Sequence, residues 1–263
     1  MAKNNKLFRW LIVFVGVFVQ MCLGTAYIWG VFQNELVTKH GFNNQSATLT
    51  YSLLLGMLTF GSMIGGVFQD KYGPKPVLLA GGITMALGFS LTSLGTASDP
   101  WIMWITYGVL SGLGMGACYT TIIAVCQKWF PDKRGVISGL IVAALGLGGV
   151  VFTPLAESLI ANKSVGVMNT FIWFGAIFIV VGIVAFLVFK NPPADYKPEG
   201  WTPPANSAVS ANRHHYSPFE VLKTHQYYLI IMAFMAATSA GFMVIPYAKT
   251  LAIQGGLDKG TVK

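Results

Sequence analysis

Seven long apolar stretches run through the sequence, and none of them contains Asp, Glu, Lys, Arg or His. Each is close to the roughly 20 mainly apolar residues that a helix needs to cross the hydrocarbon core of a bilayer. Only 10% of the 263 residues are charged, against about 25% in an average soluble domain. The sequence therefore predicts an all-α membrane protein that contacts the lipid bilayer. The stretches are Trp10–Phe32, Leu49–Phe68, Val77–Ala97, Trp101–Val125, Val136–Leu155, Asn169–Phe189 and Tyr227–Tyr247.

The basic residues lie in the segments between these stretches, and their distribution predicts the orientation. The side that holds the N-terminus carries twelve of the 17 Lys and Arg residues, and the opposite side carries the other five. Because an excess of Lys and Arg marks the cytoplasmic side, we expect a multi-pass plasma-membrane protein with a cytoplasmic N-terminus. The net charge of +8 is spread over these short segments, so no nucleic-acid partner is expected.

One connection differs from the others. Residues 191–226 form a long, polar, proline-rich segment on the predicted cytoplasmic side, and prolines favour extended backbone. Within it, Ser217–Thr224 predicts a short helix that Ser217 caps. We expect three parts: a six-helix transmembrane bundle (1–190), a cytoplasmic linker (191–226) and the first helix of a truncated C-terminal bundle (227–263). A lone seventh helix leaves a packing face uncovered, so we expect a missing C-terminal bundle and no transport by residues 1–263 alone.

A charged motif joins the second and third stretches, within Gly61–Pro76. Gly66 lets another helix approach closely, Asp70 can meet a Lys or a helix N-terminus, and Gly73 favours a turn. We interpret the motif as a conformational latch, and the alternative is an ordinary solvated loop. The spacing resembles the loop between the second and third helices of major facilitator superfamily transporters. The predicted latch residues here are Gly66, Asp70, Lys71, Gly73 and Lys75.

Three further stretches carry a more specific resemblance. They are WFPDKRG at Trp129–Gly135, GTAYIWGVF at Gly24–Phe32 and PPADYKPEGWTPP at Pro192–Pro204. They resemble the oxalate/formate antiporter family and, more distantly, the monocarboxylate transporters, and the similarity covers nearly the whole chain. It implies two six-helix bundles around a substrate cavity, alternating access and small organic anions as substrates. Lys133 and Arg134 of the first stretch join the predicted latch.

The resemblance also implies substrate-binding residues. Tyr27 and Tyr119 match cavity-facing tyrosines of that family, and Trp29 lies beside Tyr27 in the same motif. Two positions depart from the pattern, because Ala26 stands where the oxalate transporters have Gln and Leu145 where they have an aromatic residue. Both changes favour formate, lactate or pyruvate over oxalate. Without the resemblance, Tyr27 and Trp29 fit an aromatic belt at the outer interface equally well, whereas Tyr119, near the middle of its stretch, favours a wet cavity.

Two other functions stay open: a major facilitator transporter of an unrelated small solute, and a seven-helix receptor or sensor. An enzyme is not expected, because the apolar stretches contain no ionisable side chain at membrane depth. The sequence has no GxxxxGK[ST] phosphate-binding loop, so gradients, protons among them, are the expected energy source. No cofactor or metal site is expected. Since a buried carboxylate needs a cationic partner, we expect the missing bundle to supply one.

Glycines recur at four-residue spacing in the fourth stretch and at the start of the fifth. Gly108, Gly112 and Gly116 form one series, and Gly135 and Gly139 form another. Small residues at this spacing favour close helix packing. They also allow one helix bundle to rock against another in a transporter, so both interpretations are kept.

Overall fold

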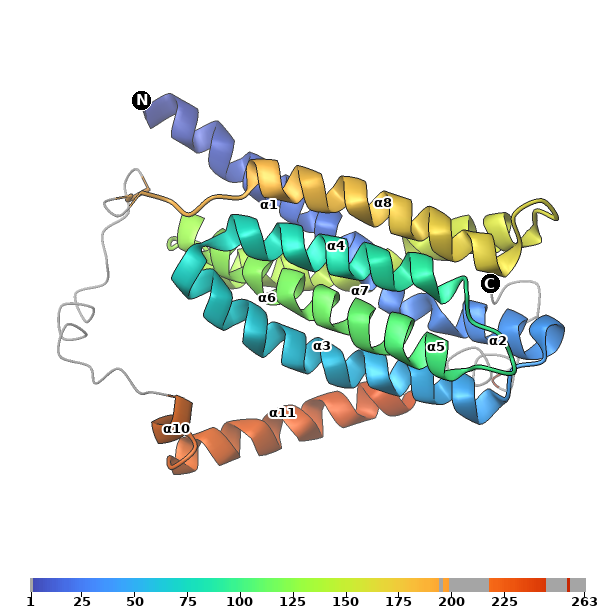
Figure 1. Ribbon diagram of the computed structural model, residues 1–263. Coiled ribbons are helices and arrows are strands. Elements are labelled where there is room, and N and C mark those ends of the chain that lie inside the picture. The colour runs from blue at the N-terminus through green and yellow to red at the C-terminus, as the bar shows by residue number, and fades with distance from the viewer. Residues whose placement is uncertain (1, 194–195, 199–217, 245–254, 256–263) are drawn as a thin grey trace. The chain divides into compact units, whose positions relative to one another are not determined.

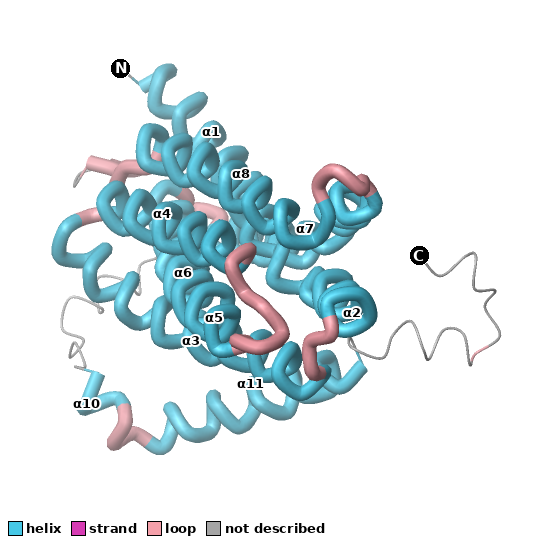
Figure 2. The backbone as a smooth tube through the Cα atoms, turned by 45° about the vertical axis from the view of Figure 1, so that its right-hand side comes forward, coloured by secondary structure: helices cyan, strands magenta, loops and turns pink. Residues whose placement is uncertain are grey.

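The structure is a computed structural model that describes residues 2–193, 196–198, 218–244 and 255. The chain divides into two units, Met1–Trp201 and Thr202–Lys263, and each is described by itself. Every regular element of the described residues is helical, which confirms the all-α prediction. Figure 1 shows the helices of the first unit as long rods that run side by side. Figure 2 shows the short loops that join them.

Six helical segments of the described chain are long and apolar enough to cross a bilayer. The first combines α1 (Ala2–Leu23), the 3₁₀ helix η1 (Gly24–Ile28) and α2 (Trp29–His40). The fourth combines α5 (Trp101–Met103), the π-helix η2 (Trp104–Ser111) and α6 (Gly112–Trp129). The other four are single helices: α3 (Asn44–Tyr72), α4 (Pro74–Thr92), α7 (Arg134–Ala161) and α8 (Gly166–Val188).

Several helices continue past their predicted membrane segments. The first stretch was expected to end at Phe32, but α2 continues to His40. Glu35 and Lys39 form a 2.6 Å ion pair one turn apart on this extension, and such i, i+4 pairs stabilise exposed helices. Gly41 then ends the helix with a left-handed φ of 70°. Hydropathy alone misses these ends because charged residues prolong the helix outside the apolar region.

The second unit contains two described helices. α10 spans Pro218–Val221 and falls within the predicted short helix, whose proposed cap, Ser217, lies outside the described residues. α11 spans His225–Val244 and corresponds to the seventh predicted stretch. The predicted end of that stretch, residues 245–247, lies outside the described part of the chain.

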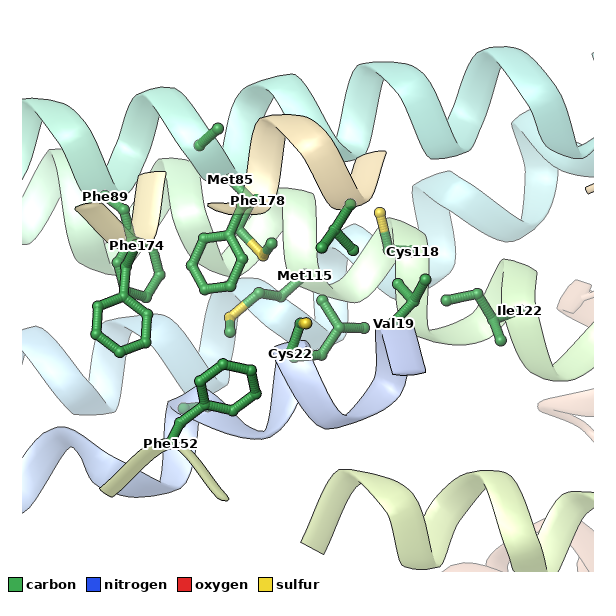
Figure 3. Close-up of a cluster of buried hydrophobic side chains, with 14 of the residues drawn as sticks. Val19, Cys22, Met85, Phe89, Met115, Cys118, Ile122, Phe152, Phe174 and Phe178 are labelled. Atoms are coloured by element: carbon green, nitrogen blue, oxygen red, sulfur yellow. The ribbon is translucent and has the colours of Figure 1, made fainter. Parts of the chain in front are cut away.

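The core of the first unit is made of aliphatic, sulfur-containing and aromatic side chains. The side chains labelled in Figure 3 belong to α1, α4, α6, α7 and α8 and point toward one another. Phe89 packs edge-to-face on Phe178, with ring centroids 4.7 Å apart. The cysteines are buried and free, as small packing residues. The labelled members are Val19, Cys22, Met85, Phe89, Met115, Cys118, Ile122, Phe152, Phe174 and Phe178.

Glycines set the closest helix crossings. A Cβ on Gly148 of α7 would overlap the carbonyl oxygen of Met21 and lie 2.7 Å from the Cα of Gly24. A Cβ on Gly112 of α6 would lie 2.7 Å from the carbonyl oxygen of Leu54 on α3. The first glycine series therefore packs closely against α3, as predicted. By contrast, a Cβ on Gly139 of α7 would meet nothing within 4 Å.

One end of the first unit gathers the start of α1, the α3–α4 turn, the α6–α7 loop and the end of α8, and we call it the N-terminal end. The predicted topology requires this arrangement, because these segments hold most of the Lys and Arg residues that were assigned to the cytoplasmic side. The assignment of that end to the cytoplasm remains a prediction. The contacts are Arg9–Asp132 at 2.9 Å, Asp70–Lys128 at 3.8 Å, and the Lys190 ammonium 4.3 Å from the Phe8 ring centroid.

Candidate functional site

The first membrane span changes helix type near its middle. α1 gives way to the 3₁₀ helix η1, in which the Thr25 hydroxyl donates to the carbonyl oxygen of Cys22 at 2.8 Å. Mid-helix 3₁₀ stretches often mark hinges or sites of strain. The tight α1–α7 crossing at Gly24 lies at the same level. Tyr27 projects from this irregular segment with 41% of its surface exposed.

The two predicted site tyrosines lie near each other. Tyr27 on η1 and Tyr119 on α6 are within electrostatic reach of one another. Tyr51 on α3 is within reach of Tyr27 in turn. Both Tyr51 and Tyr119 are half-buried against the core, so three helices bring their phenol groups into one region, which we call the tyrosine face. Tyr51 was not predicted, because its sequence neighbours carry no motif.

Gln20 supports the tyrosine face from α1. Its side chain is fully buried, and its amide nitrogen donates to the backbone carbonyl of Tyr119 at 3.3 Å. Its Oε1 has no hydrogen-bond partner among the described residues. A buried polar group costs free energy unless it is paired, so this atom is a candidate acceptor for a ligand or a water molecule. The sequence signal was present, as a lone Gln in an apolar stretch.

Trp29 is buried inside the bundle. Only 3% of its surface is exposed, and its indole nitrogen donates to the carbonyl oxygen of Ala47 at 3.1 Å. Its ring centroid is 4.4 Å from that of Tyr107. The packing ties α2 to α3 and the π-helix η2, which favours a supporting role for Trp29 over direct substrate contact.

The two positions that depart from the oxalate transporter pattern flank this region. Ala26 is buried, with 5% of its surface exposed, and Leu145 is half-buried on α7 and packs against the core. Neither side chain offers a hydrogen-bond donor. Gly149 lies one turn beyond Leu145 on α7. A Cβ built on Gly149 would lie 3.8 Å from the Cβ of Tyr27. The α7 side of Tyr27 is therefore apolar.

The predicted latch is mostly helical, whereas a charged turn was expected. Asp70 and Lys71 lie on the last turn of α3, and Lys75 lies on the first turn of α4. Only Gly73 separates the two helices, with φ of 84°, so the expected charged turn is a one-residue connection. A Cβ on Gly66 would meet nothing within 4 Å. The face at Gly66 is open to a further helix.

Asp70 meets a cation on the last turn of α6. Its carboxylate lies 3.8 Å from the Lys128 ammonium, and the two side chains are 80% and 42% exposed. Exposed pairs of this kind contribute about 0–1 kcal/mol, so the contact is easily opened. Lys133 and Arg134 lie near the start of α7 and are exposed.

A buried ion pair at the same end was not predicted. Arg9 of α1 contacts Asp132 at 2.9 Å, with side chains 10% and 18% exposed. The guanidinium lies 4.0 Å from the Phe130 ring centroid. Arg9 also donates to the Tyr196 hydroxyl at 3.5 Å, and that ring packs 4.9 Å from Trp129. We call these five residues the Arg9 cluster, which fixes α1, the α6–α7 loop and the start of the linker to one another.

The architecture is that of a polytopic α-helical membrane protein. It has six apolar spans, helix crossings made close by glycines and a tyrosine face beside an irregular helix. Among the described residues, no three His, Cys, Asp or Glu side chains gather as a metal site. The family model of the Major Facilitator Superfamily matches residues 10–262. The chain belongs to the major facilitator superfamily.

Three similar proteins narrow the setting. The chain is 31% identical over 250 residues to the uncharacterized MFS-type transporter YhjX of Escherichia coli (strain K12), covering 95% of this chain and 59% of that protein. It is 27% identical over 255 residues to the oxalate:formate antiporter of Oxalobacter formigenes, covering 95% and 58%. It is 31% identical over 183 residues to monocarboxylate transporter 13 of Rattus norvegicus, covering 68% and 40%. The chain thus spans less than two thirds of the length of these relatives, which are transporters and not enzymes.

Proposed function

We propose that this chain forms the N-terminal bundle of a secondary active transporter that moves small organic anions by alternating access. Relatives named for oxalate and formate exchange and for monocarboxylate transport support the substrate class. The observations that support the proposal are the exposed Tyr27 on the irregular segment η1 and the buried Gln20, which holds the Tyr119 backbone and keeps an Oε1 without a partner among the described residues. A plasma-membrane location with a cytoplasmic N-terminus is part of the proposal and rests on the distribution of Lys and Arg.

The chemistry of the tyrosine face suits part of a carboxylate site. Each phenol hydroxyl donates one hydrogen bond, and hydrogen bonds to an ionised acceptor are stronger than neutral ones. A phenol supplies no positive charge, however, and a buried carboxylate needs a cation. The seven apolar stretches contain no cation. We infer that the cation lies on a second bundle, which forms the opposite wall of the path.

The polarity of the region favours a monocarboxylate. Ala26 and Leu145 give the substrate no donors beside Tyr27, whereas the second carboxylate of oxalate needs partners of its own. A dianion also needs more positive charge than a monoanion at the same depth. Formate, lactate and pyruvate are therefore the proposed substrates, and the choice between exchange and proton symport depends on residues outside the apolar stretches.

The same helices provide devices for a conformational change. The 3₁₀ segment η1 places a potential hinge beside Tyr27. Pro154 interrupts the backbone hydrogen bonds of α7. The open faces at Gly66 and Gly139 let a second bundle slide closely past α3 and α7. We propose that Asp70 with Lys71, Lys75, Lys133 and Arg134 closes the N-terminal end against that bundle and releases it in turn.

The test is counterflow of labelled formate, lactate, pyruvate and oxalate into cells that express the whole reading frame containing this chain. Tyr27→Phe and Tyr119→Phe each remove one hydrogen bond to a charged group, and about 1.5–3 kcal/mol predicts a roughly 10- to 100-fold loss of monocarboxylate affinity. Tyr72→Phe is the matched control, because Tyr72 lies on α3 21 positions beyond Tyr51, about 30 Å away at 1.5 Å per residue, and 57% of its surface is exposed. Loss of its hydroxyl should change affinity less than twofold.

Preferred uptake of oxalate contradicts the proposed substrate preference. Equal effects of all three substitutions contradict the tyrosine face. Ligand binding without counterflow supports the receptor or sensor alternative. Proteoliposomes that contain residues 1–263 alone should show no exchange, because the proposed cation is absent from them.

A further inference from the structure

An apolar groove runs along the first unit where α3 and α4 diverge over α6. Each of these helices packs extensively on α6, whereas they contact each other less, and Figure 1 shows α6 between them. The groove has a volume of about 400 Å³. Ile64 and Phe68 on its α3 wall are each 50% exposed, so the groove opens at the surface of the unit. Its floor includes Gly114 and Ala117 of α6.

The lining suits a hydrocarbon and does not suit the proposed anionic substrate. Tyr72 and Thr84 are the polar side chains among the lining residues. The Thr84 hydroxyl already donates to the carbonyl oxygen of Ala80 at 2.7 Å, and Tyr72 lies at the end of α3 with 57% of its surface exposed. A carboxylate in the body of the groove would lose its hydration without a compensating partner.

The length of the groove along α3 matches the hydrocarbon thickness of one leaflet. Along α3 it extends from Tyr72 at the N-terminal end to Gly61, a difference of eleven positions. At 1.5 Å per residue this is about 16 Å. Half of a hydrocarbon core of about 30 Å is about 15 Å. The groove therefore begins at one membrane surface and ends near the middle of the bilayer.

Two exposed lysines lie at the helix ends beside the groove, although neither is a lining residue. The Lys71 ammonium lies 5.1 Å from the Tyr72 ring centroid, and the Lys75 ammonium lies 5.6 Å from that of Phe186. Both lysines are exposed. The carboxylate at these helix ends, Asp70, is paired with Lys128, so the two other lysines are not neutralised by it. Exposed lysines at a membrane surface attract anionic lipid headgroups.

We propose that this groove binds one acyl chain of an anionic phospholipid from the leaflet at the N-terminal end, with the headgroup phosphate near Lys71 beside Tyr72 and with Lys75 adding to the local positive charge. Three independent features agree on this occupant: the apolar lining, the depth of one leaflet and the lysines beside the groove. The lipid separates α3 from α4 on the outside of the bundle and holds the two charged helix ends of the latch in place. The site is distinct from the tyrosine face and does not depend on the substrate proposed above.

Photolabelling of the 263-residue chain in phosphatidylcholine nanodiscs tests the site. The probe is phosphatidylglycerol with a photoreactive diazirine on one acyl chain, and the comparison is phosphatidylcholine with the same chain. We expect mapped labels to concentrate at Ile64, Phe68 and Thr84, with at least threefold more labelling by the anionic probe. Ala80→Phe, which fills the groove, should lower that labelling at least threefold, whereas Ile83→Phe, an exposed α4 position outside the lining, should not.

The headgroup contact is tested separately. The double substitution Lys71→Gln/Lys75→Gln should remove the preference for the anionic probe, while Lys163→Gln, an exposed lysine in the α7–α8 loop, should preserve it. Unchanged melting temperatures establish that each variant is folded. Labels spread evenly over the exposed apolar surface, an unaffected Ala80→Phe variant or equal labelling by both probes would overturn the proposal.

Discussion

The Arg9 cluster gives the sharpest prediction on stability. Asp132→Asn removes the charged partner of Arg9 while keeping the size of the side chain. Loss of one partner of a fully buried ion pair costs about 3–5 kcal/mol. The Arg9 side chain is 10% exposed and that of Asp132 is 18% exposed, and the Phe130 ring continues to stabilise the guanidinium. We therefore expect the free energy of unfolding to fall by about 2–3 kcal/mol.

Asp70→Asn is the matched control, because it makes the same substitution in the other ion pair of the N-terminal end. The 3.8 Å contact of Asp70 with Lys128 is exposed, so its loss should cost less than about 1 kcal/mol. At roughly 2–4 °C per kcal/mol for a unit of this size, Asp132→Asn should lower the melting temperature by about 4–12 °C. Asp70→Asn should lower it by about 4 °C at most.

Thermal unfolding of the purified chain in detergent measures both shifts. Equal shifts for the two variants refute the reasoning, since burial would then not distinguish the pairs. The double variant Arg9→Met/Asp132→Leu separates charge from packing. Replacing both buried charges by apolar groups leaves neither charge unpaired, so the double variant should be more stable than Asp132→Asn.

Three further predictions follow from the fold. Gly148→Ala should destabilise the chain by about 1–3 kcal/mol, because the added methyl group forces α1 and α7 apart. Gly139→Ala meets open space and should be neutral or stabilising by up to about 1 kcal/mol. Equal melting temperatures of the two variants contradict the prediction. Trp29→Phe removes the indole hydrogen bond to the carbonyl oxygen of Ala47 and should cost about 0.5–1.5 kcal/mol, with an unchanged melting temperature as the opposing result. An impermeant thiol reagent should modify Lys39→Cys from outside intact cells and Lys133→Cys only after permeabilisation, and labelling of both from one side refutes the topology.

The membrane spans were predictable from the sequence because membrane insertion depends on a local run of residues and not on tertiary contacts. A run of apolar residues without charge identifies a span whatever it packs against. The ends were less predictable, as α2 and α3 show. Asp70 and Lys71 are charged, yet they remain helical because water and ion partners satisfy them beyond the hydrocarbon core.

The candidate site residues Tyr27 and Tyr119 were proposed from a resemblance to a family, and Tyr119 also from its place near the middle of its apolar stretch. Their role in binding stays a prediction. Tyr51 follows from their arrangement in space and not from its neighbours in the chain. The Arg9–Asp132 pair joins residues that are 123 positions apart, and no local pattern specifies such a partner. Asp132 lies within the WFPDKRG motif and Arg9 directly precedes the first apolar stretch, but nothing in the sequence paired them.

The solute path is tested most directly by the accessibility of Tyr27 in cells that express the whole reading frame. In a background with every native cysteine replaced by Ala, Tyr27→Cys is exposed to a hydrophilic, impermeant thiol reagent, with and without lactate or formate. Val180→Cys on α8, 61% exposed on the bundle surface, is the lipid-facing control. We predict modification of Tyr27→Cys that the carboxylate slows at least threefold, and none of Val180→Cys. Equal modification of the two positions, or no protection by any carboxylate, would contradict the account.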